Sequence, residues 1–330
     1  MHHSIIGNRT GEACFLRLPV PVRMGDLCSL RLLVSEWRYE NPLPRLSVTF
    51  DGVPDIHCYS RQIPLEWVFD GLADEVLSRE HIIESFPNSI GKRVLAIWNG
   101  DADVIEWRDP EEKDPTKQSY SFYNPSNKLE MIHMWTAWRM FMFNRKTNPV
   151  ILPPDYVTVR AAKFLHAYGV PRDFMVVQPL CEAGYHRYRN SPKEWWEEVS
   201  VICAQSGIPI VVLGPTTYLK RHNFKHNHPL IFPLFKELNN PFDSVGVISL
   251  SKGIIGGETG LPLWSAMMKI PVVSALREWG RGRDGGGRVE YRPISFGAPV
   301  VFGSLDKNPR DIAAIMSSVF EGKASSTPRE

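Results

Sequence analysis

Short apolar runs and amphipathic segments follow one another in the first half of the chain. Residues 14–20 form an apolar run that ends in prolines and predicts a strand, and residues 46–50 predict a second strand. Between them, residues 26–37 place leucine, valine and tryptophan at the spacing of one helix face. A strand, a helix and a strand in this order indicate the start of an α/β domain.

The remainder of the first half is less regular. Apolar spacing predicts a helix over residues 65–77 and a strand over residues 93–98, whereas the polar residues 101–121 predict a loop. Residues 127–144 are rich in Met, Trp and Phe and predict a long helix whose broad apolar face is buried between layers. The proline-rich residues 149–154 follow, and we expect a domain boundary near them.

The second half alternates predicted strands and helices. The predicted strands are residues 174–178, 209–213, 254–255 and 271–274. The predicted helices are residues 157–168, 192–206, 260–268 and 311–320, and residues 241–244 lead into a further apolar run at 245–250. Strands that are apolar throughout, such as Ile210-Val211-Val212-Leu213, fit a parallel sheet covered on both faces. The pattern predicts two α/β domains in tandem, with the cleft between them as the expected ligand site.

Composition narrows the class of protein. The chain has 330 residues, of which 43% are hydrophobic, so a disordered chain is excluded and roughly two domains are expected. No repeat is visible, which excludes a solenoid. The net charge of +2 is too balanced for a protein held to nucleic acid by phosphate attraction alone. Residues 1–165 hold 19 basic and 21 acidic residues and residues 166–330 hold 19 and 15, which favours the second half as the site of an anionic ligand.

Cysteine usage and the N-terminus indicate the compartment. The five cysteines are odd in number and none stands in CxxC spacing, which argues against a disulfide framework or a structural zinc site and favours reduced thiols. No apolar stretch of the signal-peptide type follows Met1. The longest apolar stretch, residues 131–143, is interrupted by polar residues and falls short of the about 20 residues that a transmembrane helix needs. We expect a soluble, cytoplasmic protein without a transmembrane segment.

A glycine-rich segment precedes the predicted helix at residues 260–268. It reads G-G-E-T-G-L-P from Gly256 to Pro262. Glycines let a ligand approach the backbone, and the amides at a helix N-terminus favour a phosphate. Thr259 adds a hydroxyl donor, and Glu258 suits a sugar hydroxyl better than a phosphate. The alternative is an ordinary tight turn in which Thr259 caps the helix.

A second candidate segment runs from Gln178, at the end of a predicted strand, to the start of the next helix. It contains Arg187, Arg189 and Lys193. Loops at the carboxyl ends of parallel strands are where α/β folds bind ligands, and the planar arginine side chain suits a diphosphate. The alternative is a solvated basic loop, with Trp195 and its neighbour Trp196 serving helix packing.

Asp26 ends the turn between the first predicted strand and helix. The turn contains Arg23-Met24-Gly25-Asp26. A carboxylate at this place faces the expected cleft, where a general base would take a proton from an incoming hydroxyl. The alternative is a helix N-cap, a role that aspartate often fills.

Two further clusters do not fit a standard site. The histidines at positions 222, 226 and 228 match no metal-site spacing, and neighbouring lysines oppose a cation. We interpret them as part of an exposed basic loop. Residues 281–288 are basic and glycine-rich, which fits either a lid over phosphates or a surface loop.

Together these segments resemble glycosyltransferase family 9, the ADP-heptose:lipopolysaccharide heptosyltransferases, which have the GT-B fold. The family opens with a strand, a turn ending in Gly-Asp, a helix and a strand, as residues 15–50 do around Gly25-Asp26. Residues 176–196 resemble its later strand, basic loop and Trp-containing helix. Glu258-Thr259-Gly260 resembles its Asp-(Ser/Thr)-Gly at a helix start, with glutamate replacing aspartate. The opening loop lacks the family's extra glycines, and the stretch at residues 281–288 is unlike the family.

The resemblance implies an α/β protein with two Rossmann-like domains facing a central cleft. Residues 1–154 would bind the acceptor, and residues 155–330, with the terminal helix, would bind the nucleotide sugar. The implied activity is an inverting, metal-independent transfer from a nucleotide-diphosphate sugar, the donor substrate, to an acceptor hydroxyl, with Asp26 as general base and no cofactor. The implied donor-binding residues are Gln178, Arg187, Arg189, Lys193, Gly214, Thr216, Gly257, Glu258, Thr259 and Gly260.

Two other functions fit the same architecture. A nucleotide-sugar 2-epimerase would convert the sugar nucleotide without an acceptor, and a non-catalytic protein would bind it without turnover. For a transferase, the expected acceptor is a glycan, a lipid-linked compound or another hydroxyl compound. A modified nucleic-acid base is a further option, to which the net charge of +2 gives little support.

Overall fold

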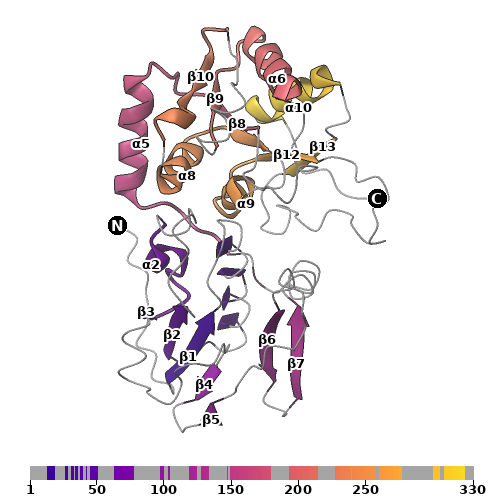
Figure 1. The fold of residues 1–330 in the computed structure, drawn as a ribbon. Helices are drawn as coiled ribbons and strands as arrows, with labels where there is room; N and C mark the ends of the chain where they lie inside the picture. Colours follow the sequence, from indigo (N-terminus) through magenta and orange to yellow (C-terminus); the bar gives the residue numbers. More distant parts are fainter. Residues whose placement is uncertain are drawn as a thin grey trace. The chain divides into compact units, whose positions relative to one another are not determined.

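The computed structural model describes segments of the chain that belong to two compact units. The described residues are 13–18, 27–28, 31–32, 34–35, 38–39, 42, 45–50, 63–77, 97–99, 103–104, 119–124, 128–133, 147, 149–179, 193–214, 227–238, 240–256, 260–276, 300–304 and 308–323. Unit 1 spans Met1–Pro149 and unit 2 spans Val150–Glu330. Figure 1 shows the helices and strands of both units. The assignment of acceptor binding to residues 1–154 and donor binding to residues 155–330 stays a prediction.

Unit 1 contains a mixed sheet. Its described strands are β1 (Ala13–Leu18), β2 (Arg45–Phe50), β3 (Glu75–Leu77), β4 (Ile97–Asn99) and β5 (Asp103–Val104). They lie in the order β3-β2-β1-β4-β5, with β1, β2 and β3 parallel and with β4 antiparallel to β1 and to β5. The described residues between 27 and 39 are helical, which confirms the predicted strand, helix and strand. The strand predicted at 93–98 is confirmed where it is described, in β4.

The predicted helix over residues 65–77 is wrong beyond its first turn. Helix α2 covers only Leu65–Val68, and the last three residues of the predicted helix form β3. Between them the chain turns at Gly71, whose φ of +74° is a left-handed conformation that favours glycine and stops a helix. Trp67 is one of the apolar residues whose spacing predicted the longer helix. Its buried side chain belongs to this single turn.

The predicted long helix over residues 127–144 is wrong where the structure describes it. Strand β7 (Lys128–His133) pairs antiparallel with strand β6 (Ser119–Asn124) in a two-stranded sheet. The sequence of β7 starts K-L-E-M, with the polar and apolar alternation of a strand, and cross-strand hydrogen bonds to β6 satisfy its backbone. The loop predicted over residues 101–121 is therefore also wrong at β5 and at the start of β6.

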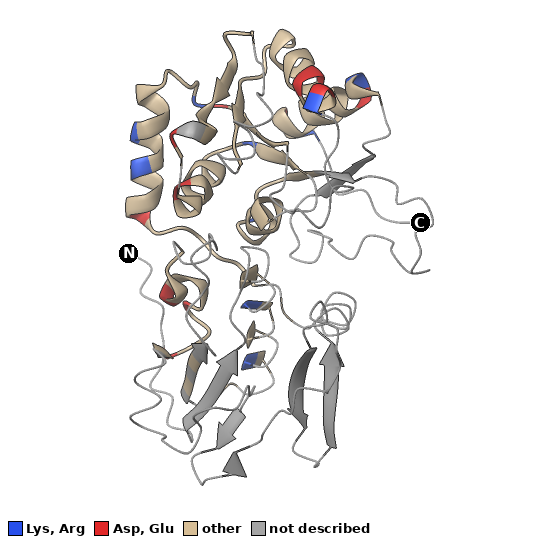
Figure 2. Cartoon of the chain, in the orientation of Figure 1, with Lys and Arg blue, Asp and Glu red and all other residues tan. Residues whose placement is uncertain are grey.

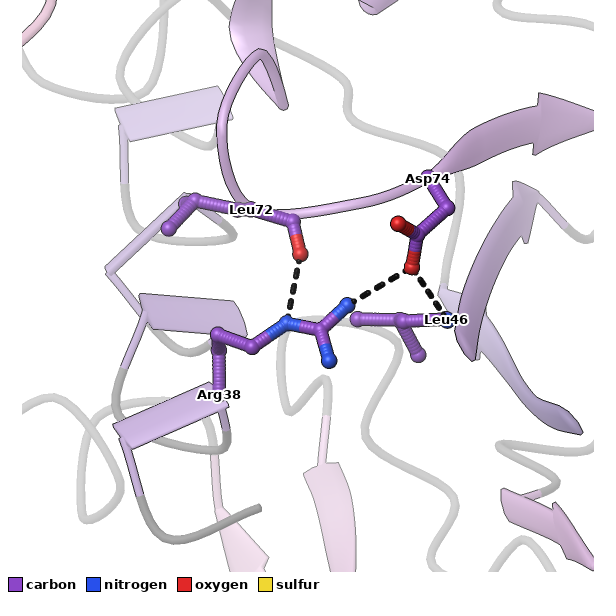
Figure 3. A network of polar contacts seen from close by, with 4 residues as sticks. All are labelled: Arg38, Leu46, Leu72 and Asp74. Carbon is purple, nitrogen blue, oxygen red and sulfur yellow. Dashed lines mark hydrogen bonds and ion pairs between the residues drawn. The ribbon is translucent and has the colours of Figure 1, made fainter. Parts of the chain in front are cut away.

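Arg38 and Asp74 join three segments of unit 1 (Figure 3). The Arg38 side chain donates from Nε to the carbonyl oxygen of Leu72 at 2.8 Å and from Nη2 to Oδ2 of Asp74 at 3.0 Å. The same Oδ2 accepts the backbone N–H of Leu46, in β2, at 2.7 Å. The ion pair is largely buried, since the side chains of Arg38 and Asp74 are 8% and 11% exposed. It connects the described helical residues between 27 and 39, the turn after α2, and the sheet.

A second buried arginine holds the same turn. Arg31 donates from Nη1 to the carbonyl oxygen of Val68 and, at 3.3 Å, to that of Asp70. Burial lowers the pKa of Arg31 to about 10, against the opposing effect of Asp70 and Cys28, so its guanidinium remains protonated at neutral pH. Arg31 and Arg38 stand about two helical turns apart and therefore lie on one side of the helical segment.

Unit 2 contains a sheet whose described strands are all parallel. They are β8 (Met175–Gln178), β9 (Ile210–Val212), β10 (Ile231–Pro233), β11 (Gly253–Gly256), β12 (Val272–Leu276) and β13 (Val300–Ser304). They lie in the order β10-β9-β8-β11-β12-β13. The four predicted strands are confirmed as β8, β9, β11 and β12. The two edge strands were missed; β10 is short and ends in a proline, which weakens a strand signal.

Helices cover both faces of this sheet (Figure 1). Those described are α5 (Asp155–Ala167), α6 (Lys193–Gln205), α8 (Pro241–Ser249), α9 (Gly260–Met267) and α10 (Pro309–Phe320). They confirm the four predicted helices of the second half, and the apolar run at 245–250 belongs to α8. Helices α6 and α10 pack together, and α8 packs against both α5 and α9. Every helix in the described segments is too short or too polar to cross a membrane.

Side chains of the unit 2 strands alternate between the two helix layers. Met175 and Val177 pack with Trp196 of α6 and Met316 of α10 in one buried cluster. Gln178, one residue further on, therefore faces the layer that contains α9. Helices α5, α6 and α10 carry charged residues (Figure 2), whereas β8, β9 and β11 contain none. The sheet thus has the apolar strands predicted for a sheet covered on both faces.

Cys203 belongs to the same buried cluster. Its Sγ lies 3.6 Å from the Sδ of Met316, and burial raises the pKa of the thiol to about 12. The thiol is therefore protonated at neutral pH and is a packing group rather than a nucleophile.

Replacing Trp196 by alanine is expected to destabilise the chain strongly. Trp196 is 1% exposed, and its indole N–H has no hydrogen-bond partner among the described residues, so its contribution comes from packing. We expect Trp196→Ala to lower the free energy of unfolding by about 3–5 kcal/mol. Urea denaturation followed by circular dichroism measures the loss. Trp195→Ala, at the half-buried neighbour, is the matched control and should cost clearly less; equal losses would contradict the central place of Trp196 in the core.

Candidate functional site

The strand order of unit 2 defines a ligand-binding edge. From β8 the chain adds β9 and β10 on one side, and it then returns to add β11, β12 and β13 on the other. The connections that follow the neighbouring strands β8 and β11 therefore lead in opposite directions. In parallel α/β sheets, ligands bind at such a switch point, outside the carboxyl ends of the strands. The candidate site lies at the ends of β8 and β11.

Gln178 and Gly256 meet at this switch point. They are the last residues of β8 and β11 and are partners across the two strands. A Cβ atom placed on Gly256 would lie 3.5 Å from the Cβ of Gln178, so the glycine backbone adjoins the glutamine side chain. Gln178 is 5% exposed, and its amide carries both donors and an acceptor. The structure thus places a buried polar side chain at the switch point.

Gly214 lies just after β9, the strand that flanks β8 on the side away from β11. The backbone N–H of Leu213 donates to the carbonyl oxygen of Val177 at 2.9 Å, which holds the chain beside the end of β8. The next residue, Gly214, has a φ of +141°, which L-residues rarely adopt. Glycine is therefore required where the chain turns away from β9 at the same sheet edge.

Lys193 is the first residue of α6. Its Nζ lies 3.6 Å from Oε1 of Glu197, one turn further along the helix, and each side chain is 18% exposed. This pairing places a carboxylate beside the lysine and offsets part of its positive charge. Of the three cationic side chains predicted to bind phosphate, Lys193 thus already forms an ion pair with an acidic side chain.

Gly260 begins α9, four residues after the end of β11. A helix that starts here directs its first backbone amides to the carboxyl edge of the sheet, where the positive end of its dipole favours an anion. The helix itself is held firmly. Residues 261–268 are buried, and the carbonyl oxygen of Met267 accepts the backbone N–H of Ile151 at 3.2 Å.

The structure therefore brings four predicted site residues to one edge of the sheet: Gln178, Lys193, Gly214 and Gly260. Seven others lie outside the described residues: Asp26, Arg187, Arg189, Thr216, Gly257, Glu258 and Thr259. Residues 281–288 and two of the three clustered histidines also lie outside them. The described one, His228, accepts the backbone N–H of Leu230 through Nδ1 at 3.2 Å, which occupies that nitrogen in a local turn.

Gly256 starts the glycine-rich segment that the sequence marks as a ligand site, but it was not among the predicted donor-binding residues. The sequence did contain a signal, because Gly256 ends an apolar strand and a proline follows in the first turn of the next helix. What this arrangement offers chemically is a set of backbone amides at the N-terminus of α9 beside a buried amide side chain. Such groups can bind an anionic, hydroxylated ligand.

Comparisons with known proteins agree with this fold. No protein-family model matches the sequence, and no curated protein matches it. A glycosyl transferase family 9 structure from Veillonella parvula DSM 2008 matches with a TM-score of 0.53 and 10% identity, over 94% of this chain and 91% of that one. The ADP-heptose lps heptosyltransferase II of E. coli matches with a TM-score of 0.56 and 12% identity, over 94% of this chain and 99% of that one. The chain shares the α/β fold of these two proteins, which confirms the predicted fold class.

Proposed function

We propose that the chain is a glycosyltransferase that moves a sugar from a nucleotide-diphosphate sugar to an acceptor hydroxyl. The observation that carries the proposal is the fold shared with two glycosyltransferases over 94% of the chain. The switch point adds support, because Gln178, Gly214 and Gly260 stand at the sheet edge where α/β folds bind nucleotides.

The donor diphosphate is assigned to the carboxyl edge of the unit 2 sheet. In this proposal the amides of Thr259 and Gly260 bind its oxygens, and Glu258 accepts a hydrogen bond from a sugar or ribose hydroxyl. Arg187 and Arg189 stabilise the negative charge of the leaving diphosphate. We favour these arginines over Lys193 because Glu197 already offsets part of the lysine charge. Preorganised donors at the place where charge develops contribute strongly to catalysis.

The acceptor is activated by Asp26 in this proposal. The carboxylate takes the proton of the acceptor hydroxyl while the hydroxyl oxygen forms a bond to the anomeric carbon. The bond from that carbon to the diphosphate breaks, and its electron pair leaves on the diphosphate oxygen. Attack on the side opposite the leaving group inverts the anomeric configuration, and no metal ion is needed. The reaction requires the two domains to face a common cleft, as the sequence predicts.

The neighbours suggest which substrates to test first. The E. coli protein is named for ADP-heptose and lps. We therefore place ADP-heptose first among donors and a lipid-linked glycan first among acceptors, in a reducing, cytoplasmic compartment that the cysteine usage favours. Nothing in the fold or the comparisons favours a nucleic-acid base as acceptor, and we do not propose it.

Incubation of the full chain with candidate nucleotide sugars tests the activity. The expected result is release of nucleoside diphosphate that depends on an added acceptor such as lipopolysaccharide. Conversion of the nucleotide sugar into its epimer without acceptor would instead identify an epimerase. Binding with neither reaction, across a panel of acceptors, would identify a non-catalytic binding protein.

Removing a proposed phosphate contact should weaken nucleotide binding. From the usual strength of charged and neutral hydrogen bonds, we expect Arg189→Ala to reduce affinity about 10- to 100-fold and Thr259→Ala about 2- to 10-fold. The probe is whichever of ADP, UDP, GDP and CDP most raises the thermal midpoint of the unaltered chain, and calorimetry gives its affinity.

The matched control is Arg172→Ala. Arg172 is exposed and precedes β8, at the opposite edge of the same sheet, so its replacement should leave affinity unchanged. Unaltered affinity in both Arg189→Ala and Thr259→Ala would place the diphosphate elsewhere.

A further inference from the structure

Gly256 is a glycine for reasons of space rather than backbone conformation. The described glycines with positive φ do not include it, so its backbone is one that other residues adopt. A Cβ atom at this position, however, would lie 2.8 Å from Cγ of Pro262, a distance that real Cβ contacts do not show. The proline ring occupies the volume that any other residue at 256 would need.

The contact joins the end of β11 to the first turn of α9. Pro262 is the third residue of that helix, and its ring is fixed to the helix backbone. The same Cβ position is 3.5 Å from the Cβ and 3.6 Å from the carbonyl oxygen of Gln178, which is already van der Waals contact. A side chain at 256 therefore cannot move towards β8, and the strain falls on the start of α9.

The remainder of α9 has little freedom to relieve that strain. Residues 261–268 are buried, and the far end of the helix is bonded through Met267 to Ile151. Close-packed interiors transmit strain instead of absorbing it. A Cβ at 256 should therefore displace the first turn of α9 relative to the end of β8 while the last turn stays in place.

We infer that Gly256 and Pro262 are positioning residues for the diphosphate, because their contact sets the place of the first-turn amides of α9 relative to Gln178. The inference rests on the proposed function, in which those amides bind the donor. It assigns a role to two residues that touch no substrate themselves. Their effect is on the geometry of the neighbouring backbone donors.

The test is a double-mutant cycle on the full chain. Gly256→Ala, Pro262→Ala and the double variant are compared with the unaltered chain for binding of ADP, UDP, GDP and CDP by calorimetry. Because misplaced amides lose hydrogen bonds to the charged diphosphate, we expect Gly256→Ala to weaken nucleotide affinity at least about 10-fold. In the Pro262→Ala background, where the ring is absent, Gly256→Ala should cost less than about 3-fold. Pro262→Ala also adds a backbone N–H at position 262. Because the Pro262→Ala variant and the double variant both carry this N–H, it does not affect the comparison between them.

Gly253→Ala is the matched control. Gly253 begins the same strand, and a Cβ there would be as crowded, at 2.9 Å from Cγ1 of Val319 and 3.0 Å from the carbonyl oxygen of Pro271. These contacts lie at the amino end of β11, away from the candidate site. Gly253→Ala should lower the thermal midpoint, as overpacking does, yet leave nucleotide affinity unchanged.

The outcomes separate this inference from the proposed function. If the unaltered chain binds a diphosphate but Gly256→Ala binds it equally well, the positioning role is wrong and the proposed function stands. Equal losses of affinity in Gly253→Ala and Gly256→Ala would mean that the loss reflects lower stability of the fold. That result would also overturn the positioning role. If Gly256→Ala does not fold, the double variant decides: it should fold and bind like Pro262→Ala. If the unaltered chain binds none of the four nucleotides, both proposals fail.

Discussion

Asp26→Asn is expected to abolish glycosyl transfer while leaving nucleotide binding intact. Asparagine has nearly the shape of aspartate and still caps a helix, but it cannot take a proton from the acceptor hydroxyl. General-base catalysis contributes about 10²- to 10⁴-fold, and we expect a fall of this size in kcat. Initial rates of diphosphate release by the purified variant measure it, and calorimetry with the nucleoside diphosphate measures the donor affinity.

The control for this experiment is Glu66→Gln. Glu66 is an exposed carboxylate in α2 of the same unit, and its neutralisation should change neither kcat nor donor affinity. Turnover by Asp26→Asn at the unaltered rate would remove Asp26 as the base and leave it the role of helix cap. A parallel loss of donor affinity would instead mean that Asp26 serves binding or folding.

Asp74→Ala is expected to cost about 3–5 kcal/mol of unfolding free energy, because it leaves a buried guanidinium without its carboxylate. The Asp74 carboxylate binds Nη2 of Arg38 at 3.0 Å and the backbone N–H of Leu46 at 2.7 Å. Its removal therefore takes a carboxylate acceptor away from two donors in a largely buried setting. Urea denaturation of the full chain gives the change in free energy and in midpoint.

An exposed ion pair of similar length provides the comparison. Nζ of Lys252 lies 3.2 Å from Oδ1 of Asp173, with the two side chains 48% and 59% exposed. Asp173→Ala should cost less than about 1 kcal/mol, since water screens such pairs. If Asp74→Ala costs no more than Asp173→Ala, the hydrogen bonds and ion pair between Arg38 and Asp74 do not stabilise unit 1 as their burial indicates.

The contrast between the two units shows which elements sequence can predict. In unit 2, β9 is the run Ile-Val-Val, and α6 and α10 carry regular apolar faces, so local pattern and final environment agree. In unit 1, β7 forms because β6 offers it hydrogen bonds, a condition set by another segment of the chain. The spacing of Met, Trp and Phe after residue 127 concealed that partner. The turn at Gly71 likewise depends on Arg31, whose bonds to the turn no local pattern reveals.

For the candidate site too, the sequence predicts the residues whose place follows from local pattern and misses those that depend on distant segments. Gln178 and Gly260 stand at the ends of elements that local pattern finds, so the sequence identified their place. The role of Gly256 was hidden, because it depends on a proline ring folded back onto the strand and on the neighbouring strand beside it. A pattern of residue types gives the composition of such a turn but not the distances within it.

The central position of β8 makes unit 2 depend on pairing between distant parts of the chain. Met175 pairs with Ile210 on one side and with Gly253 on the other, so the two walls of the switch point come from segments far apart along the chain. Closing such long loops costs conformational entropy before the strand contacts form. Pairing of parallel strands that are distant in the sequence is therefore slow. During synthesis, β8 and β9 emerge first and present an unpaired apolar edge until β11 arrives. Until β11 pairs with β8, the candidate site lacks the wall that Gly256 supplies.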